Sequence, residues 1–266
     1  MLGASFSEAG IGDASNDIEA IFDQTVVTYP ECFRPMLNKH RARLLWQVGF
    51  VYRNVKPGGS LLDIGGGVVP LMFMCSKLGY KVTVVDDYAG VFRHPDDTAR
   101  VLEIFDKFGV RVLHGDACAE GEINSLDQMF DLVTSHDSME HWHNSPKRLF
   151  HFLWSRMNPS ALFWIGVPNC VNLRKRMTAL IGDAKWSQME DWYEKPVFRG
   201  HVREPDVRDL RYIATDLGAS RCEVIGRNWL GYTNRSAFIR AVIPLVDHAL
   251  RLVPSLCSDI YLIAWK

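Results

Sequence analysis

Three acidic residues stand near the ends of successive predicted strands, a pattern that suits a nucleotide-like ligand with cationic groups. Asp63 precedes a run of three glycines, Gly65, Gly66 and Gly67, at a strand-to-helix turn. Glycine there permits positive φ and lets a ligand approach the main chain. Asp86 follows the next strand and, with Asp87 as a second candidate, could accept both hydroxyls of a ribose. Asp116, beside Ala117, follows the third strand, where a carboxylate could accept an adenine amine.

The spacing of the glycines separates two kinds of cofactor. A dinucleotide fingerprint requires a further glycine where this chain has Pro70. Each acid alone would be typical of a solvated loop. Three acids at successive strand ends favour a ligand site, because ligands of such sheets bind at the carboxyl edge.

Composition excludes several other classes of protein. The chain has 266 residues, 30 Lys and Arg against 31 Asp and Glu, and a net charge of -1, which argues against a nucleic-acid partner. Its six cysteines show no CxxC spacing, so we expect reduced thiols in the cytoplasm. Residues 1–25 lack the pattern of a signal peptide, and no apolar run approaches the ~18 residues of a membrane span. Membrane contact without a membrane-spanning segment remains compatible with the sequence.

Strand and helix patterns alternate through the middle of the chain. This predicts an α/β fold: a doubly wound, Rossmann-like, mostly parallel sheet with helices on both faces. We expect a single domain over 1–266, with an N-terminal arm and helix (1–56), a cofactor-binding core (57–167), an insertion on the substrate side (168–204) and a C-terminal part (205–266). Residues 1–35 are predicted to be a loose arm. Strands are predicted at 61–64, 81–85, 111–113, 130–135, 161–167, 222–226 and 260–265, and helices at 36–55, 69–78, 98–108, 145–157 and 205–217.

Two insertions interrupt the alternation, one after the fifth strand and one between the sixth and seventh. The first carries Arg174 to Arg176, which is either a solvated face or a contact for an anionic substrate, and Trp186 and Trp192, which are expected to pack as a lid. In the second, residues 236–253 form an amphipathic pattern interrupted by Pro244. We expect this segment to pack on the core or line a pocket; an interfacial helix for a lipidic substrate is the alternative.

Several motifs, in this order along the chain, resemble the class I S-adenosylmethionine-dependent methyltransferases, within the broad type 11/type 23 group. The resemblance extends over about residues 37–230 and implies an antiparallel last strand. Val69 replaces the usual third glycine of the loop, and Pro159-Ser160-Ala161 stands where Pro-Gly-Gly is common. The motifs are Asp63-Ile64-Gly65-Gly66-Gly67, Asp86, Gly115-Asp116-Ala117, Phe130-Asp131-Leu132-Val133, Glu140-His141, Val167-Pro168-Asn169 and Gly200-His201-Val202-Arg203-Glu204.

The resemblance implies a role for each matching position. Asp63 and Gly65 to Gly67 would hold the methionine moiety and ribose, Asp86 the ribose diol, and Asp116 with Ala117 the adenine. Ser135 and His136, at the end of the fourth strand, would lie under the sulfonium of S-adenosylmethionine.

Methyl transfer to a hydroxyl also requires a base, and histidine is the usual one near neutral pH. Within residues 136–143 we favour His141, with His201 as the second choice. A structural role for His141, binding backbone groups, is an equal alternative. A metal site built from His136, Asp137, His141 and His143 fits by residue type, but no second ligand group at diagnostic spacing appears, so we expect no metal.

We therefore expect a methyltransferase using S-adenosylmethionine, acting on an oxygen of a small-molecule, sugar or lipid-linked acceptor. The alternatives are a non-catalytic binder of the same ligand and, less favoured, a nicotinamide-dependent oxidoreductase. Charge is unevenly distributed: residues 63–140 hold six basic and fourteen acidic groups (net -8), whereas 141–266 hold eighteen and eleven (net +7). An acidic half suits a cationic cofactor, and a basic half favours an anionic acceptor.

Overall fold

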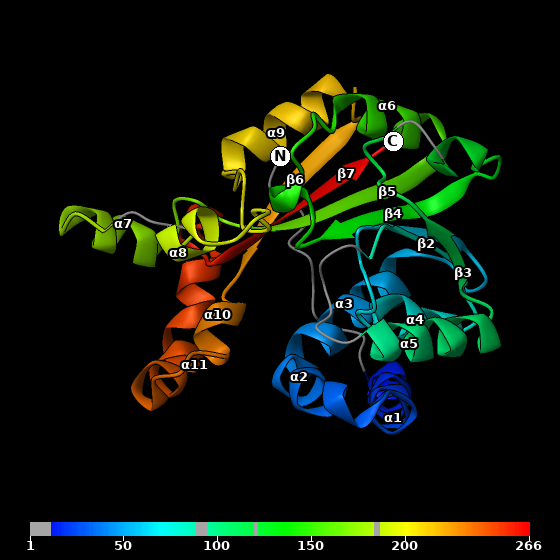
Figure 1. Cartoon of the computed structure of the whole chain (residues 1–266), viewed down its shortest axis with the longest axis horizontal. Helices are drawn as coiled ribbons and strands as arrows, with labels where there is room; N and C mark the ends of the chain where they lie inside the picture. Colours follow the sequence, from blue (N-terminus) through cyan, green and yellow to red (C-terminus); the bar gives the residue numbers. More distant parts are fainter. Residues whose placement is uncertain (1–11, 89–94, 120–121, 184–186) are drawn as a thin grey trace.

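A mixed sheet runs through the computed structural model, which describes residues 12–88, 95–119, 122–183 and 187–266. Within these residues it has seven strands in the order β3-β2-β1-β4-β5-β7-β6 (Figure 1). The first five are parallel, and β7 is antiparallel to both of its neighbours, so the predicted sheet with an antiparallel last strand is confirmed. The strands are β1 (Ser60–Ile64), β2 (Lys81–Asp86), β3 (Arg111–His114), β4 (Phe130–His136), β5 (Met157–Pro168), β6 (Arg221–Arg227) and β7 (Asp259–Trp265).

Helices cover both faces of the sheet because successive strand residues point to opposite sides. Leu61 and Trp164 pack among the helices of one face, α1 to α5, whereas their neighbours Leu62 and Ile165 pack toward α6 and α9 on the other. All four side chains are fully buried, and each such burial contributes roughly 1.5–3 kcal/mol. The helices so placed include α3 (Arg41–Asn54), α4 (Leu71–Lys77), α5 (Pro95–Lys107), α6 (Lys147–Ser155) and α9 (Val207–Asp216).

The N-terminal segment is a helix rather than the predicted loose arm. Helix α1 (Gly12–Thr28) is followed by a short η1 (Glu31–Phe33) and by α2 (Arg34–Lys39). Ile18, Phe22 and Tyr29 are buried in the core cluster of the α1 to α5 face. Their spacing of four and seven residues places them on one side of a helix, a stripe that the intervening acidic residues obscure in the sequence. Residues 1–11 of the predicted arm lie outside the described residues.

Smaller corrections concern element boundaries. The helix predicted at 36–55 is divided at His40, which separates α2 from α3. The helix predicted over 145–157 ends at Ser155, because Met157 already pairs with Phe130 as the first residue of β5. Helix α9 begins at Val207 because Asp206 and Asp209 form a reciprocal capping box at its N-terminus.

Both predicted insertions are present and project beyond the carboxyl end of β5 (Figure 1). The first carries α7 (Leu173–Leu180) and α8 (Met189–Tyr193), and the second carries α10 (Trp229–Tyr232), α11 (Ala237–Arg251) and η4 (Pro254–Leu256). Among the described helices, none combines the length and the apolar character that crossing a bilayer requires.

Candidate functional site

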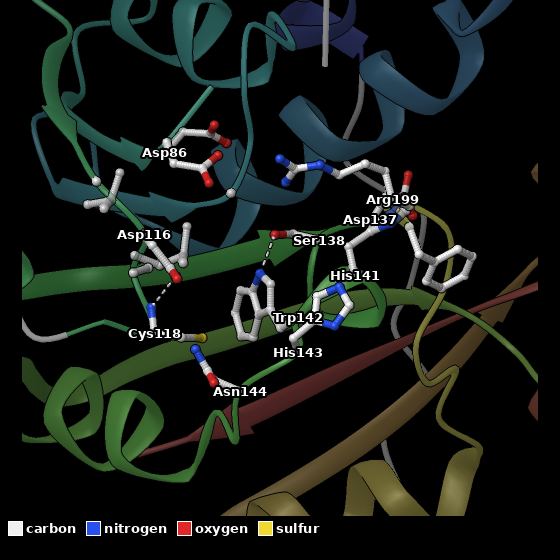
Figure 2. A pocket seen from close by; sticks show the side chains of 17 residues that line it. Asp86, Asp116, Cys118, Asp137, Ser138, His141, Trp142, His143, Asn144 and Arg199 are labelled. Carbon is white, nitrogen blue, oxygen red and sulfur yellow. Dashed lines mark hydrogen bonds between the residues drawn. The ribbon is translucent and has the colours of Figure 1, made fainter. Parts of the chain in front are cut away.

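A cavity of about 460 Å³ opens at the carboxyl ends of β1 to β4 (Figure 2). Its volume lies within the ~300–1,000 Å³ typical of small-ligand pockets. Asp86, Asp116 and Asp137 line it from three different strand ends, and Arg199 reaches it from the first insertion. The cavity therefore has the acidic character that a ligand with cationic groups requires.

The glycine turn after β1 brings bare backbone to the edge of this cavity. Gly65 has φ +72°, and a Cβ there would lie 1.8 Å from Ser138 Oγ. A Cβ on Gly66 would lie 1.7 Å from Asp63 Oδ2. The Gly67 N–H donates to Asp86 Oδ2 over 2.8 Å, which ties the turn to the end of β2. Side chains cannot replace hydrogen at the first two positions without displacing Ser138 or Asp63.

Asp63 packs against the glycine turn at Gly66. Its side chain is buried and accepts a 2.6 Å hydrogen bond from Thr134 Oγ1 on β4. Burial raises the pKa of Asp63 to about 7, although the Thr134 hydrogen bond opposes the shift. Of the predicted glycine-turn residues, Gly65 lines the cavity, whereas Asp63, Gly66 and Gly67 do not.

The other predicted acids line the cavity directly. Asp86, Asp87, Asp116 and Ala117 all contribute to its wall. Burial raises the pKa of Asp86, and the N–H groups of Tyr88 and Gly67 that it accepts oppose the shift. Asp116 accepts from the Cys118 N–H over 2.8 Å, which fixes the loop after β3.

Ser135 and His136 line neither this cavity nor the second one described below. His136 is enclosed on the α3 side of the sheet, where Nδ1 lies 2.9 Å from Gln47 Nε2 and the ring meets Trp164 edge-on at 4.3 Å between centroids. Burial, with a contribution from nearby Arg43, lowers the pKa of His136 to about 3. It is therefore a neutral packing residue at physiological pH.

A second cavity, of about 750 Å³, adjoins the first and is lined by α3, the first insertion and the start of β7. Asp137 and His141 line both cavities. Asp137 has φ +51° and forms a 2.5 Å ion pair with Arg43, which holds the pKa of this carboxyl below its usual range despite burial. Asp137 and His141 are thus the residues through which groups bound in the two cavities would meet.

The two predicted histidines, sixty positions apart in the sequence, lie together at this junction. Their rings meet edge-on with centroids 4.8 Å apart. His141 Nδ1 donates to the carbonyl oxygen of Arg199 over 3.0 Å, and burial lowers the pKa of His141. His201 Nδ1 donates to Glu204 over 2.7 Å. His141 lines both cavities, and His201 lines only the second. The backbone contact of His141 fits a structural role, and its place at the junction fits a role as the base, so the two interpretations are compatible.

Glu140 lies beside the two histidines. It is 1% exposed, and among the residues that the structure describes its Oε2 has no hydrogen-bond partner. Burial, followed by the neighbouring Asp137, raises the pKa of Glu140 well above its usual value. Its backbone oxygen accepts from the N–H groups of Val202 and Arg203, which holds the end of the first insertion against η3 (Met139–His141).

Several site residues were not predicted from the sequence. Arg43 lies one turn before the buried Gln47 on α3. Two polar residues four positions apart beside the apolar stripe were the signal in the sequence that could have indicated a functional role for Arg43. No local signal marks Arg199. The basic triplet, by contrast, was expected to be either a solvated face or an anion contact; Arg174 and Lys175 line the second cavity, and Lys175 forms an ion pair with Glu204.

Trp192 does not pack as the predicted lid, and its neighbour Tyr193 is exposed as well. Trp192 is 61% exposed and Tyr193 73% exposed, since α8 has no buried residue against which they could pack. Trp186 lies outside the described residues.

Comparisons with known proteins agree with this geometry. Residues 38–220 match a family model described as a methyltransferase domain, whereas curated proteins gave no match. A cyclopropane-fatty-acyl-phospholipid synthase-like protein from Lactobacillus casei superposes with a TM-score of 0.62 at 14% identity, over 95% of this chain and 99% of that one. A SAM-dependent methyltransferase from Archaeoglobus fulgidus gives 0.53 at 19% identity, over 87% and 99% of the two chains. A possible histamine N-methyltransferase from Thermotoga maritima gives 0.53 at 15%, over 94% and 99%. At these identities the structural likeness shows the fold.

Proposed function

Because this chain belongs to the methyltransferase domain family and is an S-adenosylmethionine-dependent enzyme, we propose that it methylates an oxygen of a small-molecule, sugar or lipid-linked acceptor. The observation that carries this proposal is the pair of adjoining cavities that share Asp137 and His141. One cavity has the acids and bare backbone suited to the cofactor, and the other is large enough for an acceptor.

The residues of the first cavity fit S-adenosylmethionine, which supplies a methyl group on a positively charged sulfur. We assign the ribose hydroxyls to Asp86 and Asp87 and the adenine to Asp116 and Ala117, because these residues line the wall beyond β2 and β3. The Gly65 to Gly67 turn, which Asp63 supports, provides the bare backbone beside the methionine moiety. The acidic wall favours a cationic ligand over a neutral one of the same shape.

The residues at the junction would orient the acceptor and handle its proton. Methyl transfer requires the attacking oxygen in line with the methyl group, and good orientation alone can supply ~7–11 kcal/mol of the barrier. His141 keeps Nε2 open because Nδ1 is bound to a backbone carbonyl, and its lowered pKa keeps the ring neutral near pH 7. A neutral imidazole at this position can accept the hydroxyl proton, with His201 as the second candidate.

Individual cations of the second cavity are the support for an anionic acceptor, although acidic residues outnumber them in its lining. Arg43, Arg174 and Lys175 line it, although Arg43 and Lys175 are already paired with Asp137 and Glu204. Arg199 adds a cation on the side of the first cavity. An anionic group on the acceptor would pair with Arg174 or Arg199.

A surface on α11 supports a lipid-linked acceptor. Phe238, Leu245 and Leu252 repeat at seven-residue spacing and are 75%, 81% and 74% exposed. Interfacial helices present such exposed apolar side chains to a lipid surface. The expected packing of this segment on the core is wrong for these three residues. Co-sedimentation with anionic vesicles should fall for Leu245→Ser; equal binding of the variant and wild type would remove this support.

We also propose a cytoplasmic location, which rests on the six cysteines being free thiols.

Calorimetry and product analysis test the function. S-adenosylhomocysteine should bind with measurable heat and NAD should not. Methyl transfer should occur to hydroxylated acceptors, faster to anionic than to cationic ones, and product NMR should locate the new methyl on oxygen. His141→Ala should lose transfer while retaining cofactor binding, with His248→Ala on exposed α11 as the matched control. A methyl found on nitrogen, or full turnover by His141→Ala, would contradict the assignment.

A further inference from the structure

We propose that Glu140, His141 and His201 form a binding site for one divalent metal ion where the two cavities meet. Each residue offers one ligand atom, and these three atoms all lie within 4.8 Å of one another. His141 lines both cavities, and Glu140 and His201 line the second. This group differs from the set that fits a metal site by residue type in the sequence, His136, Asp137, His141 and His143, because His201 is distant from those residues along the chain.

Hydrogen bonds fix both histidines in the form that binds metal. His141 Nδ1 lies against the backbone oxygens of Arg199 and Gly200, at 3.0 and 3.3 Å, so it must carry the proton. His201 Nδ1 likewise donates to Glu204 Oε1, whose other oxygen accepts from Lys175. Nε2 of each ring is therefore left as a lone-pair donor. Metal-bound histidines in proteins have this same arrangement, in which a carbonyl or carboxylate accepts the second ring N–H.

Glu140 would supply the negative charge that the site requires, releasing its proton to solvent as the cation binds. Its side chain is buried, yet Oε2 has no hydrogen-bond partner in the part of the chain that the structure describes. A buried carboxylate oxygen without a partner is costly, so native structures rarely leave one without a function. A cation bound to this oxygen would remove the cost.

The ligand set indicates the class of metal. Two imidazoles and one carboxylate are typical of Zn²⁺ and of non-haem iron or manganese sites, and they leave coordination positions open for other ligands. Metal–nitrogen bonds of ~2.0–2.1 Å place neighbouring ligand atoms of a tetrahedral site roughly 3.3 Å apart. Because the three ligand atoms lie within 4.8 Å of one another, they would approach by up to about 1.5 Å on binding the ion, through rotation of the side chains.

The role of the ion rests on the proposed function. A cation at the junction would bind the acceptor hydroxyl and lower its pKa, releasing the proton to water. The freed oxygen lone pair would form the bond to the methyl carbon as the carbon–sulfur bond breaks and its electron pair stays on sulfur. With the ion bound, His141 would act as a ligand, and solvent would replace it as the acceptor of the hydroxyl proton.

Metal binding can be measured without the cofactor. The full chain, treated with EDTA and dialysed, is titrated with Co²⁺ and followed by its visible d–d absorption, and Zn²⁺ binding is followed by calorimetry. One equivalent of each should bind. Glu140→Gln and His201→Ala should lose this site. Glu204→Gln, which changes the partner of His201 and of Lys175 but removes no ligand atom, should weaken binding by ~10–100-fold.

His248→Ala, an exposed histidine on α11, is the control and should bind Co²⁺ like wild type. Near-UV circular dichroism and binding of S-adenosylhomocysteine verify that each variant is folded. The absence of a stoichiometric site in wild type, or unchanged binding in both Glu140→Gln and His201→Ala, would overturn the proposal. Such a result leaves cofactor binding intact, whereas failure of the proposed function appears as methylation of nitrogen or as no transfer by protein that binds both metal and cofactor.

Discussion

Replacing Gly65 by alanine is the sharpest perturbation of the cofactor cavity. The residue has φ +72°, and a Cβ there would lie 1.8 Å from Ser138 Oγ and 2.7 Å from Ser138 Cβ. Ser138 lines the cavity and accepts a 3.1 Å hydrogen bond from Trp142 Nε1. The substitution therefore strains the turn and displaces a wall residue together with its partner.

The magnitude separates into two parts. A non-glycine residue in the left-handed region costs ~1–2 kcal/mol. Forcing an additional methyl group into a packed site costs a further ~1–3 kcal/mol. Gly58 has φ +77° with nothing within 4 Å of a Cβ, so Gly58→Ala carries the first cost alone. Gly65→Ala should thus lower the free energy of unfolding by roughly 2–5 kcal/mol, against roughly 1–2 kcal/mol for the control.

Urea unfolding and calorimetry with S-adenosylhomocysteine provide the measurements. Displacement of Ser138 should weaken cofactor binding at least about tenfold, which corresponds to ~1.4 kcal/mol. Because both close atoms belong to the Ser138 side chain, the double variant Gly65→Ala/Ser138→Gly should recover the packing part of the stability loss relative to Ser138→Gly. The reasoning is refuted if Gly65→Ala destabilises no more than Gly58→Ala and binds the ligand like wild type.

Three further predictions concern other parts of the fold and site. Asp86→Asn should weaken binding of S-adenosylhomocysteine by ~1.5–3 kcal/mol, because the ribose loses a charged acceptor; an unchanged Kd would remove Asp86 from this role. Burial raises the pKa of Asp63 from 3.8 to about 7, so the neutral form favours folding and stability is lost as pH rises through that window. Asp63→Asn should consequently gain stability relative to wild type in urea unfolding at pH 8 compared with pH 5, and a pH-independent difference would contradict the shift. Phe22→Ala should lower the free energy of unfolding by ~3–5 kcal/mol because this residue of α1 is buried in the core, whereas Val27→Ala, at a position 74% exposed, should change it little. Equal effects of the two substitutions would argue against the docking of α1.

The sheet was predictable because its signals are local. The runs around Leu62, Val84 and Val133 are apolar and β-branched, and glycine or proline bounds most of them. Helix α1 was missed because Ile18, Phe22 and Tyr29 are spaced among acidic residues, so their shared face emerges only when the segment is drawn as a helix.

Part of the site was predictable for the same reason, and the rest was not. Asp86 and Asp116 follow strands, and parallel strands bring their carboxyl ends to one edge wherever they lie in the sequence. The pairing of His141 with His201 depends instead on the Val202 N–H reaching the Glu140 backbone oxygen. That contact is tertiary and leaves no trace in local spacing. The Arg43 to Asp137 ion pair joins α3 to the end of β4 in the same way.

The division of the chain near His141 corresponds to the division of the site in space, although the lining of the second cavity itself holds more acidic than basic residues. Most residues of the first cavity come from the acidic stretch before His141, and most of the second come from the basic stretch after it. Asp137 and His141, which line both cavities, stand at the boundary between the two stretches. The acceptor half can therefore change through the first insertion while β1 to β4 and their acids stay fixed. Because the junction is the place where both ligands meet, a cation held there by Glu140, His141 and His201 would act on any acceptor that the insertion admits.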